Sequence, residues 1–310
     1  MKAVFLDADT LGGDVDLSPI EEVTGVMVRY PRTSPEQVSE RIRGFDTVLV
    51  NKVVLGRSHF EACPELKTIA VVATGLNNID QQAARDHGIT VLNVVGYGRS
   101  AVAQHTMALM LALATRLLDY DRDVRAGRWA DSDMFCLMDH PIMELEGRTL
   151  GVVGLGDLGQ GVVERARAFG MNILLGARPG QPTGERDGFL QVSLDELLAR
   201  ADVVSLHCLL SDETRNMIGA RELALMKPSA LLINTSRGGL VDEQALVDAL
   251  RKGIIAGAGF DVLTEEPPRN GNPLLAGDIQ NLIVTPHSAW ASREARQRIV
   301  DITARNLAGE

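Results

Sequence analysis

The stretch of sequence that decides the fold is RTLGVVGLGDLGQGVVERARAFGMNILLGAR, residues 148–178. Its first part, Thr149 to Val153, is a short apolar run that ends at a glycine, which is typical of a strand buried on both faces. Apolar residues then recur at helical spacing between Leu158 and Phe169, and a second apolar run covers Met171 to Leu175. The stretch therefore predicts a strand, a tight turn, a helix and a second strand.

Three glycines in the predicted turn, Gly154, Gly156 and Gly159, fit the pattern G-x-G-x-x-G. In that pattern the first glycine permits the turn, the second lets the backbone approach a pyrophosphate, and the third brings the helix against the strand. The free N–H groups at the start of the helix would then face the phosphates. The pattern predicts a dinucleotide-binding site, and a purely structural turn is the alternative.

The end of the second predicted strand bears on the choice of cofactor. An acidic residue there normally binds the adenosine ribose hydroxyls, but this chain has Gly176, Ala177 and Arg178. A carboxylate would repel a 2′-phosphate, whereas the guanidinium of Arg178 could pair with one. The sequence therefore weakly favours NADP over NAD. The alternative is that Arg178 is a solvated loop residue beside a pocket that accepts both cofactors.

Composition narrows the class of protein. A chain of 310 residues is long for one core, so two domains are expected. The net charge of −10, without a run of Lys or Arg, argues against non-specific binding to nucleic acid or to an anionic membrane. Cys63, Cys136 and Cys208 are odd in number and lack metal-ligand spacing, which favours free thiols in a reducing compartment and no metal site. Because Asp7 and Asp9 make the first residues unlike a signal peptide, we expect a cytoplasmic protein.

Strands and helices alternate along the chain, which predicts parallel sheets with helical crossovers. One long helix is expected from Ser100 to Leu118, continuing to Gly127, and residues 128–147 look irregular, either a surface loop or a contact with a second subunit. Strands of a first domain are expected at 2–6, 25–30, 47–50, 66–73 and 90–95. Strands of a doubly wound second domain are expected at 150–153, 171–175, 203–207, 230–234, 256–261 and 283–285.

Three chemically useful side chains, Arg237, Glu266 and His287, follow predicted strands of the second domain. Ligands of such sheets bind at the carboxyl ends of the strands. A histidine can exchange the proton that accompanies hydride transfer, a neighbouring carboxylate favours its protonated form, and a guanidinium can bind a substrate carboxylate. These residue types suit reduction of a 2-keto acid. Each also has a structural alternative: an ion-paired arginine, a solvated turn glutamate and a core histidine. We expect His105 to be structural and His207 to line the cofactor cleft without catalysing.

Four motifs in order resemble those of the D-isomer-specific 2-hydroxyacid dehydrogenases over nearly the whole chain. They are the glycine turn at 154–159, NTSRGG at 234–239, GFDVLTEEP at 259–267 and TPHSAW at 285–290. Residues 51–53, 74–80 and 287–292 are most similar to the glycerate dehydrogenases of that family, also called hydroxypyruvate reductases. The resemblance implies an α/β protein in which a Rossmann-type doubly wound domain, 99–285, is inserted into a smaller flavodoxin-like substrate domain, 1–98 and 286–310. It also implies a homodimer joined through the nucleotide domains.

The resemblance assigns roles to individual residues. Arg237, Glu266 and His287 would be the catalytic set, with His287 as the acid/base. The substrate would be bound by Lys52, Thr74, Gly75, Leu76, Arg237 and His287. The cofactor would be bound by Thr106, Gly154, Gly156, Asp157, Leu158, Gly159, Arg178, His207, Thr214, Thr235, Asp261 and Ala289. Hydroxypyruvate and glyoxylate would be the leading substrates, reduced to the D-2-hydroxy acid with NAD(P)H.

Alternatives remain at this point. The family includes transcriptional corepressors, so a dinucleotide-sensing binding protein is one rival, although nothing basic or groove-like in the sequence favours it. A dehydrogenase of a bulkier or phosphorylated 2-hydroxy acid is another. The chain also departs from the family pattern at Gln104, where many relatives have an acid, at Leu209, where a proline is usual, and at Ala177, where the acid that would favour NAD is missing.

Overall fold

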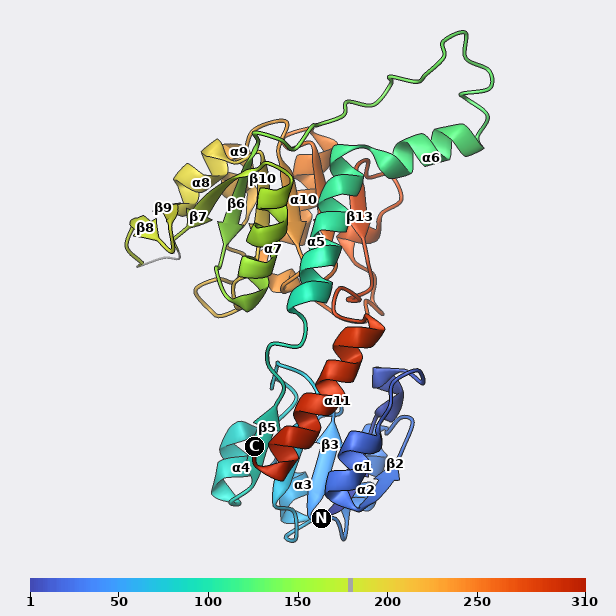
Figure 1. The fold of residues 1–310 in the computed structure, drawn as a ribbon, viewed down its shortest axis with the longest axis vertical. Coiled ribbons are helices and arrows are strands. Elements are labelled where there is room, and N and C mark those ends of the chain that lie inside the picture. The colour runs from blue at the N-terminus through green and yellow to red at the C-terminus, as the bar shows by residue number, and fades with distance from the viewer. Residues whose placement is uncertain (178–180) are drawn as a thin grey trace. The chain divides into compact units, whose positions relative to one another are not determined.

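The computed structural model describes residues 1–177 and 181–310 and divides into two compact units (Figure 1). The first comprises Met1–Gly98 and Ala291–Glu310, and the second is Arg99–Trp290. Residues 286–290, which the sequence analysis assigned to the first domain, cluster with the second unit. The reason is local, because the Asp261 carboxylate at the end of a strand of that unit accepts hydrogen bonds from the amides of Ser288 and Ala289.

The first unit is built on a parallel five-stranded sheet in the order β2-β1-β3-β4-β5. This is the flavodoxin-like order that was expected. Helix α11 (Arg293–Ala308), from the end of the chain, packs against α1 (Ser18–Thr24) of the same unit. The strands are β1 (Lys2–Phe5), β2 (Val26–Arg29), β3 (Thr47–Val50), β4 (Thr68–Val71) and β5 (Thr90–Asn93). The other helices are α2 (Val38–Ile42), α3 (Arg57–Glu61) and α4 (Gln81–Asp86).

The second unit has an eight-stranded sheet in the order β13-β12-β11-β10-β6-β7-β9-β8, parallel except for the β8–β9 pair. The chain runs outward from β6 in one direction and returns to its other side with β10, so the order reverses at β6 and β10, where open α/β sheets bind ligands. The strands are β6 (Thr149–Val153), β7 (Asn172–Gly176), β8 (Gly184–Arg186), β9 (Phe189–Val192), β10 (Val203–Leu206), β11 (Leu231–Asn234), β12 (Gly257–Phe260) and β13 (Leu282–Val284). The helices beside them are α7 (Asp157–Ala168), α8 (Leu194–Arg200), α9 (Ala220–Leu225) and α10 (Glu243–Arg251).

The long helix expected from Ser100 is two helices. Helix α5 (Arg99–Ala114) is mostly buried, and α6 (Leu117–Arg125) leaves it at a bend of 58°. The prediction of one continuous helix was wrong because Arg116, at the break, has a left-handed φ of 54° that a helix cannot hold. Within the described residues no single helix is long and apolar enough to cross a membrane, and the bent α5–α6 pair passes that test only when its two parts are taken together.

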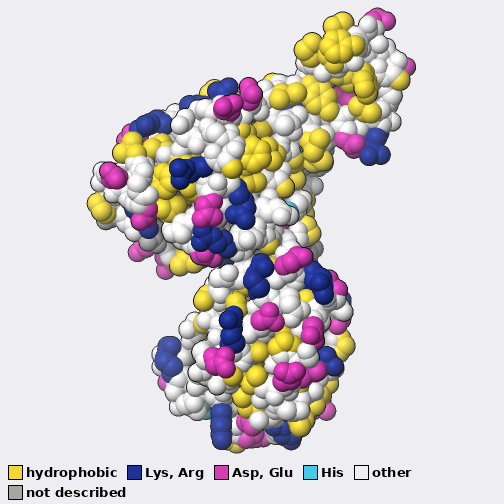
Figure 2. Space-filling model, viewed as in Figure 1, with side chains coloured by type: hydrophobic (Ala, Val, Ile, Leu, Met, Phe, Trp, Pro, Cys, Tyr) yellow, Lys and Arg dark blue, Asp and Glu magenta, His cyan; other side chains and the backbone are white. Residues whose placement is uncertain are grey.

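Helix α6 and the irregular segment after it extend away from the sheet of their unit (Figure 1). We call residues 117–142 the arm. Figure 2 shows that apolar side chains gather on it. The exposed large apolar residues of the arm are Leu117, Leu118, Val124, Trp129, Met134, Phe135, Met138 and Ile142.

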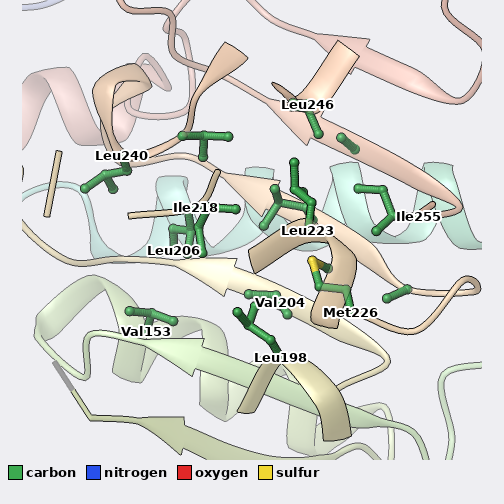
Figure 3. Close-up of a cluster of buried hydrophobic side chains, with 14 of the residues drawn as sticks. Val153, Leu198, Val204, Leu206, Ile218, Leu223, Met226, Leu240, Leu246 and Ile255 are labelled. Carbon is green, nitrogen blue, oxygen red and sulfur yellow. The ribbon is translucent and has the colours of Figure 1, made fainter. Parts of the chain in front are cut away.

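Alternate residues of the central strands of the second unit enter two different apolar clusters. In β10, Val204 and Leu206 belong to one cluster and Val203 to the other, as expected for a strand with helices on both faces. Figure 3 shows the first cluster, in which Val204 and Leu206 lie with Ile218 and Leu223. The burial of both faces fixes the register of β6 and β10, and with it the position of the loops at their carboxyl ends.

Candidate active site

The glycine turn after β6 has the geometry that a bound pyrophosphate requires. Gly154 has a φ of 100°, and a Cβ there would lie 2.7 Å from the backbone nitrogen of Cys208. A Cβ on Gly159 would lie 2.2 Å from the carbonyl oxygen of Gly154, so this glycine permits the close approach of α7 to the turn. By contrast, nothing lies within 4 Å of a Cβ placed on Gly156, the residue that caps α7. The turn is therefore closed where the protein packs on itself and open where a phosphate would approach the helix N-terminus.

The residues that begin α7 are Asp157 and Leu158, both expected to contact the cofactor. The Asp157 carboxylate pairs with Arg99 of α5, whose Nη1 lies 3.0 Å from Oδ1. This contact ties the first turn of α7 to the start of α5. The backbone N–H groups of that turn are the part of it that suits an anion.

His207 follows β10 and forms one wall of the glycine turn. Its backbone carbonyl lies against Gly154, and its Nε2 lies 2.8 Å from the hydroxyl oxygen of Ser205. Burial lowers the pKa of His207 to about 4, so the imidazole is neutral at ordinary pH. Its Nδ1 is buried and has no hydrogen-bond partner among the described residues. Such an atom next to the glycine turn fits a site that a polar ligand completes.

Other residues expected at the cofactor lie around the same strand ends. The hydroxyl oxygens of Thr106, on α5, and Thr235, after β11, are buried and 2.9 Å apart. Thr214 shapes the loop after β10, because its hydroxyl donates to the Leu209 carbonyl at 2.7 Å. Ala289 is buried and its amide donates to Asp261. Arg178 lies outside the described residues, and Ala177 before it is buried and leaves no carboxylate at that position.

The structure brings His287 and Glu266 together, although 21 residues separate them along the chain. His287 Nδ1 lies 2.6 Å from Glu266 Oε2, and a third of each side chain is exposed to solvent. The second carboxylate oxygen of Glu266 accepts the amide of Leu263 at 2.8 Å. The carboxylate is thus held by the backbone on one side and holds the imidazole on the other.

Glu266 stays ionised in this arrangement. Burial raises the pKa of its carboxyl, but the hydrogen bonds from His287 and Leu263 and the positive charge of Arg237 outweigh that effect and leave the pKa below its usual value. A carboxylate that keeps its charge favours the protonated form of a hydrogen-bonded imidazole. The pair is therefore suited to store a proton and to deliver it from Nε2, the ring nitrogen opposite the one bound to Glu266.

Arg237 is placed by the tight turn after β11. Asn234 fixes this turn, because its side chain donates to the Arg237 carbonyl at 2.9 Å and accepts the amide of Ser236 at 3.1 Å. The next residue, Gly238, cannot carry a side chain, since a Cβ there would lie 2.0 Å from the carbonyl carbon of Leu263. The turn therefore packs directly on the loop that carries Glu266, which brings the exposed Arg237 guanidinium close enough for its charge to act on that carboxyl.

Asp261 organises the loop that carries His287. Its buried carboxylate accepts the Thr285 hydroxyl at 2.5 Å and the amides of Ser288 at 2.9 Å and Ala289 at 2.8 Å. His287 itself has a left-handed φ of 52°, a conformation that needs support from its surroundings in a non-glycine residue. The family resemblance implies a place for Asp261 at the cofactor. The anchoring is not apparent from the sequence, because nothing local links residue 261 to residues 285–289.

His105 contacts the same loop from α5. Its Nε2 lies 2.9 Å from the Thr285 hydroxyl oxygen and 3.5 Å from Asp261. These contacts join His105 to the Asp261 anchor and not to the His287–Glu266 pair.

The remaining expected substrate residues lie in the first unit, at the carboxyl ends of β3 and β4. Lys52 follows β3 and is exposed, and Thr74, Gly75 and Leu76 follow β4. The Thr74 hydroxyl donates to the Val94 carbonyl at 2.8 Å. Among the described residues, the backbone N–H groups of 74–76 donate to no protein acceptor. Backbone amides without a protein acceptor can bind carboxylates.

Comparison with known proteins identifies the family. The family model described as D-isomer specific 2-hydroxyacid dehydrogenase, NAD binding domain, matches residues 107–289. The chain belongs to this family. It is 44% identical over 308 residues to a glycerate dehydrogenase of Methylorubrum extorquens, covering 99% of this chain and 95% of the relative. A hydroxypyruvate reductase of Blautia hydrogenotrophica is 39% identical, with 99% and 96% covered.

A solved structure agrees with both relatives. The NADPH-dependent glyoxylate/hydroxypyruvate reductase from Sinorhizobium meliloti, in complex with NADP and malonate, has a TM-score of 0.81 and 29% identity, covering 99% of this chain and 93% of that one. The 2-hydroxyacid dehydrogenase resemblance predicted from the four motifs is therefore confirmed, as is its closeness to the glycerate dehydrogenases. The family match and the neighbour in complex with NADP support a nicotinamide dinucleotide as the cofactor of this oxidoreductase.

Proposed function

We propose that this dehydrogenase reduces a small 2-keto acid, hydroxypyruvate or glyoxylate, to the D-2-hydroxy acid and catalyses the reverse oxidation of D-glycerate. The observation that carries the proposal is the His287–Glu266 hydrogen bond of 2.6 Å beside the Arg237 turn. Relatives named glycerate dehydrogenase, hydroxypyruvate reductase and glyoxylate reductase support the same substrates. They do not favour a corepressor-like binding protein or a dehydrogenase of a bulkier acid.

The proposed chemistry divides between cofactor and protein. A bound reduced nicotinamide would supply the hydride to the carbonyl carbon. The protein supplies the proton, which passes from the Nε2 of protonated His287 to the carbonyl oxygen. Glu266 stabilises the imidazolium before that transfer and orients the ring through Nδ1. Arg237 binds the substrate carboxylate and polarises the carbonyl.

The family resemblance also assigns substrate contacts to residues of the first unit. Lys52 supplies a positive charge, and the amides of Thr74, Gly75 and Leu76 supply directional donors. The assignment of Lys52 rests on the family resemblance of residues 51–53.

NADP is the preferred cofactor in this proposal. Ala177 provides no carboxylate to repel a 2′-phosphate, and the solved relative from Sinorhizobium meliloti is NADPH-dependent. We expect the Michaelis constant for NADPH to be lower than that for NADH. A strong preference for NADH would overturn this assignment without affecting the proposed reaction.

A panel of keto acids assayed with both cofactors tests the function, and His287→Ala tests the site. The wild-type protein should turn over hydroxypyruvate or glyoxylate, and the variant should lose at least about a hundredfold in kcat because general acid/base help is worth that much. NADPH binding, followed by fluorescence, should persist in the variant. Near-normal turnover by His287→Ala would refute the role of His287, and no turnover of any keto acid by the wild type would refute the function.

We also propose that the enzyme is a homodimer joined through the arm. The arm exposes eight large apolar residues, an unusual concentration for a monomer surface. Its path is nevertheless fixed by polar contacts, because Asp123 Oδ2 lies 2.8 Å from His140 Nε2 and the Tyr120 hydroxyl donates to the His140 carbonyl at 2.9 Å. A segment that is fixed by polar contacts and exposes apolar side chains is suited to be covered by a second subunit.

A further inference from the structure

Asp7, just beyond β1, is a buried carboxylate that binds three successive backbone amides. Only 3% of the residue is exposed. Its Oδ1 accepts the amide of Asn51 at 2.9 Å, and its Oδ2 accepts the amides of Lys52 at 2.7 Å and Val53 at 3.2 Å. A buried charge is costly unless hydrogen bonds compensate it, and here the loop after β3 supplies that compensation. In return, the carboxylate fixes the direction of all three peptide groups of the loop.

Asn78 holds the same loop through its carbonyl oxygens. Its Nδ2 donates to the Val53 carbonyl at 2.9 Å and to the Asn51 carbonyl at 3.4 Å. The backbone of Asn78 adds a third tie, because its carbonyl accepts the amide of Leu55 at 2.9 Å. Residues 51–53 are therefore bound by Asp7 through their N–H groups and by Asn78 through their C=O groups.

Asp7 and Asn78, which we call the clamp, also join two loops that lie at the same edge of the sheet. Strands β3 and β4 are parallel neighbours, so residues 51–53 and residues 72–80 both leave the sheet at its carboxyl end. Asn78 belongs to the second of these loops, four residues beyond Thr74. Its side chain therefore links the loop that carries Lys52 to the loop whose amides at 74–76 donate to no protein acceptor.

We propose that Asp7 and Asn78 are positioning residues that hold Lys52 and the 74–76 amides in the orientation that binds the substrate carboxylate. The inference rests on the proposed function, and it adds two residues that the sequence motifs did not single out for this role. Neither residue is assigned any contact with the substrate. Both act through the loop between them, so their removal should weaken the binding of the keto acid more than the chemical step.

Asp7→Asn and Asn78→Ala test the clamp from its two sides. An asparagine at residue 7 would turn an N–H group toward a loop amide, and an alanine at residue 78 removes both contacts to the loop carbonyls. We expect KM for hydroxypyruvate to rise about tenfold or more, because hydrogen bonds to a charged carboxylate are among the stronger ones in proteins. We expect kcat and KM for NADPH to change little, since the clamp contains no residue of the second unit.

Asp46→Asn is the matched control. Asp46 also ties β1 to β3, accepting the amide of Lys2 at 3.1 Å, but it does so at the amino ends of these strands. If the Asp7 carboxylate were merely structural, Asp7→Asn and Asp46→Asn would give the same result. Both would lower the melting temperature and leave KM unchanged. The clamp predicts that KM rises in Asp7→Asn but not in Asp46→Asn.

A double-mutant cycle with Lys52→Met separates positioning from general loosening. If Asp7 acts through Lys52, the Asp7→Asn change should raise KM much less when Lys52 is already replaced. Equal effects in both backgrounds, or an Asp7→Asn KM that matches Asp46→Asn, would overturn the inference while leaving the proposed reaction intact. If Asp7→Asn does not fold, Asn78→Ala carries the same test. An inactive wild-type protein would instead refute the proposed function itself.

Discussion

In the proposed reaction, the Glu266 carboxylate orients the imidazole of His287 through its hydrogen bond to Nδ1. Glu266→Gln keeps the shape of the side chain but replaces the carboxylate that lies 2.6 Å from Nδ1 by a neutral amide. We expect kcat for keto-acid reduction to fall about 100-fold, because general acid/base help is typically worth about 10²- to 10⁴-fold and depends on the orientation of the imidazole. Initial rates of hydroxypyruvate reduction at saturating NADPH check this, and an unchanged kcat in Glu266→Gln would contradict it.

The buried imidazole of His207 leads to a prediction about stability and not about catalysis. Burial lowers the pKa of His207 to about 4 from its usual value of 6.5, so the unfolded chain binds this proton more readily than the folded one. Its neutral form therefore contributes stability that is complete above pH 6.5 and is lost as the pH falls toward about 4. His207→Asn should show a shallower loss of unfolding free energy across that window in urea titrations. Above neutral pH the two proteins should have the same slope, and equal slopes throughout would refute the prediction.

At the scale of elements, the contact between the Arg237 turn and the Glu266 loop depends on one missing side chain. In Gly238→Ala the new methyl group would lie 2.0 Å from a backbone carbon of Leu263, so one loop must move. We expect kcat/KM to fall about a hundredfold, a loss that a displacement near 1 Å can cause. Gly277→Ala is the control, because nothing lies within 4 Å of a Cβ there. Unchanged kinetics in Gly238→Ala would show that the loops yield without disturbing Arg237.

The elements that the sequence predicted well are those whose residues meet the core directly. Strands β6 and β10 are buried on both faces and appear in the sequence as predominantly apolar runs. The hairpin of β8 and β9 was missed because Gly184–Arg186 is exposed and has no apolar pattern. The break between α5 and α6 was missed because a single left-handed backbone at Arg116 causes it, and no residue type there requires that conformation.

The residues of the candidate site also fall into those that the sequence predicts and those whose roles it does not show. Arg237, Glu266 and His287 were accessible to prediction because each follows a strand and belongs to an ordered motif. The residues that hold them, such as Asp261 for the His287 loop and Gly238 for the Arg237 turn, were not assigned those roles. Their partners are distant in sequence, and only the folded chain brings an amide at residue 288 to a carboxylate at residue 261. Local pattern thus predicts the reactive groups, whereas tertiary contacts determine their orientation.

At the scale of the whole molecule, the arm predicts a subunit contact that single substitutions can weaken. Phe135 is its most exposed large side chain, at 86%, and would be buried if a second subunit covers the arm. Phe135→Asp should raise the dimer dissociation constant at least about tenfold, because burying an aromatic side chain is worth about 1.5–3 kcal/mol. Leu275→Asp is the control, since Leu275 is 49% exposed in the same unit but lies outside the arm. Sedimentation equilibrium measures both constants. A monomeric wild-type protein, or equal dissociation of the two variants, would refute the dimer, because an apolar surface that no partner covers loses nothing when it gains a charge.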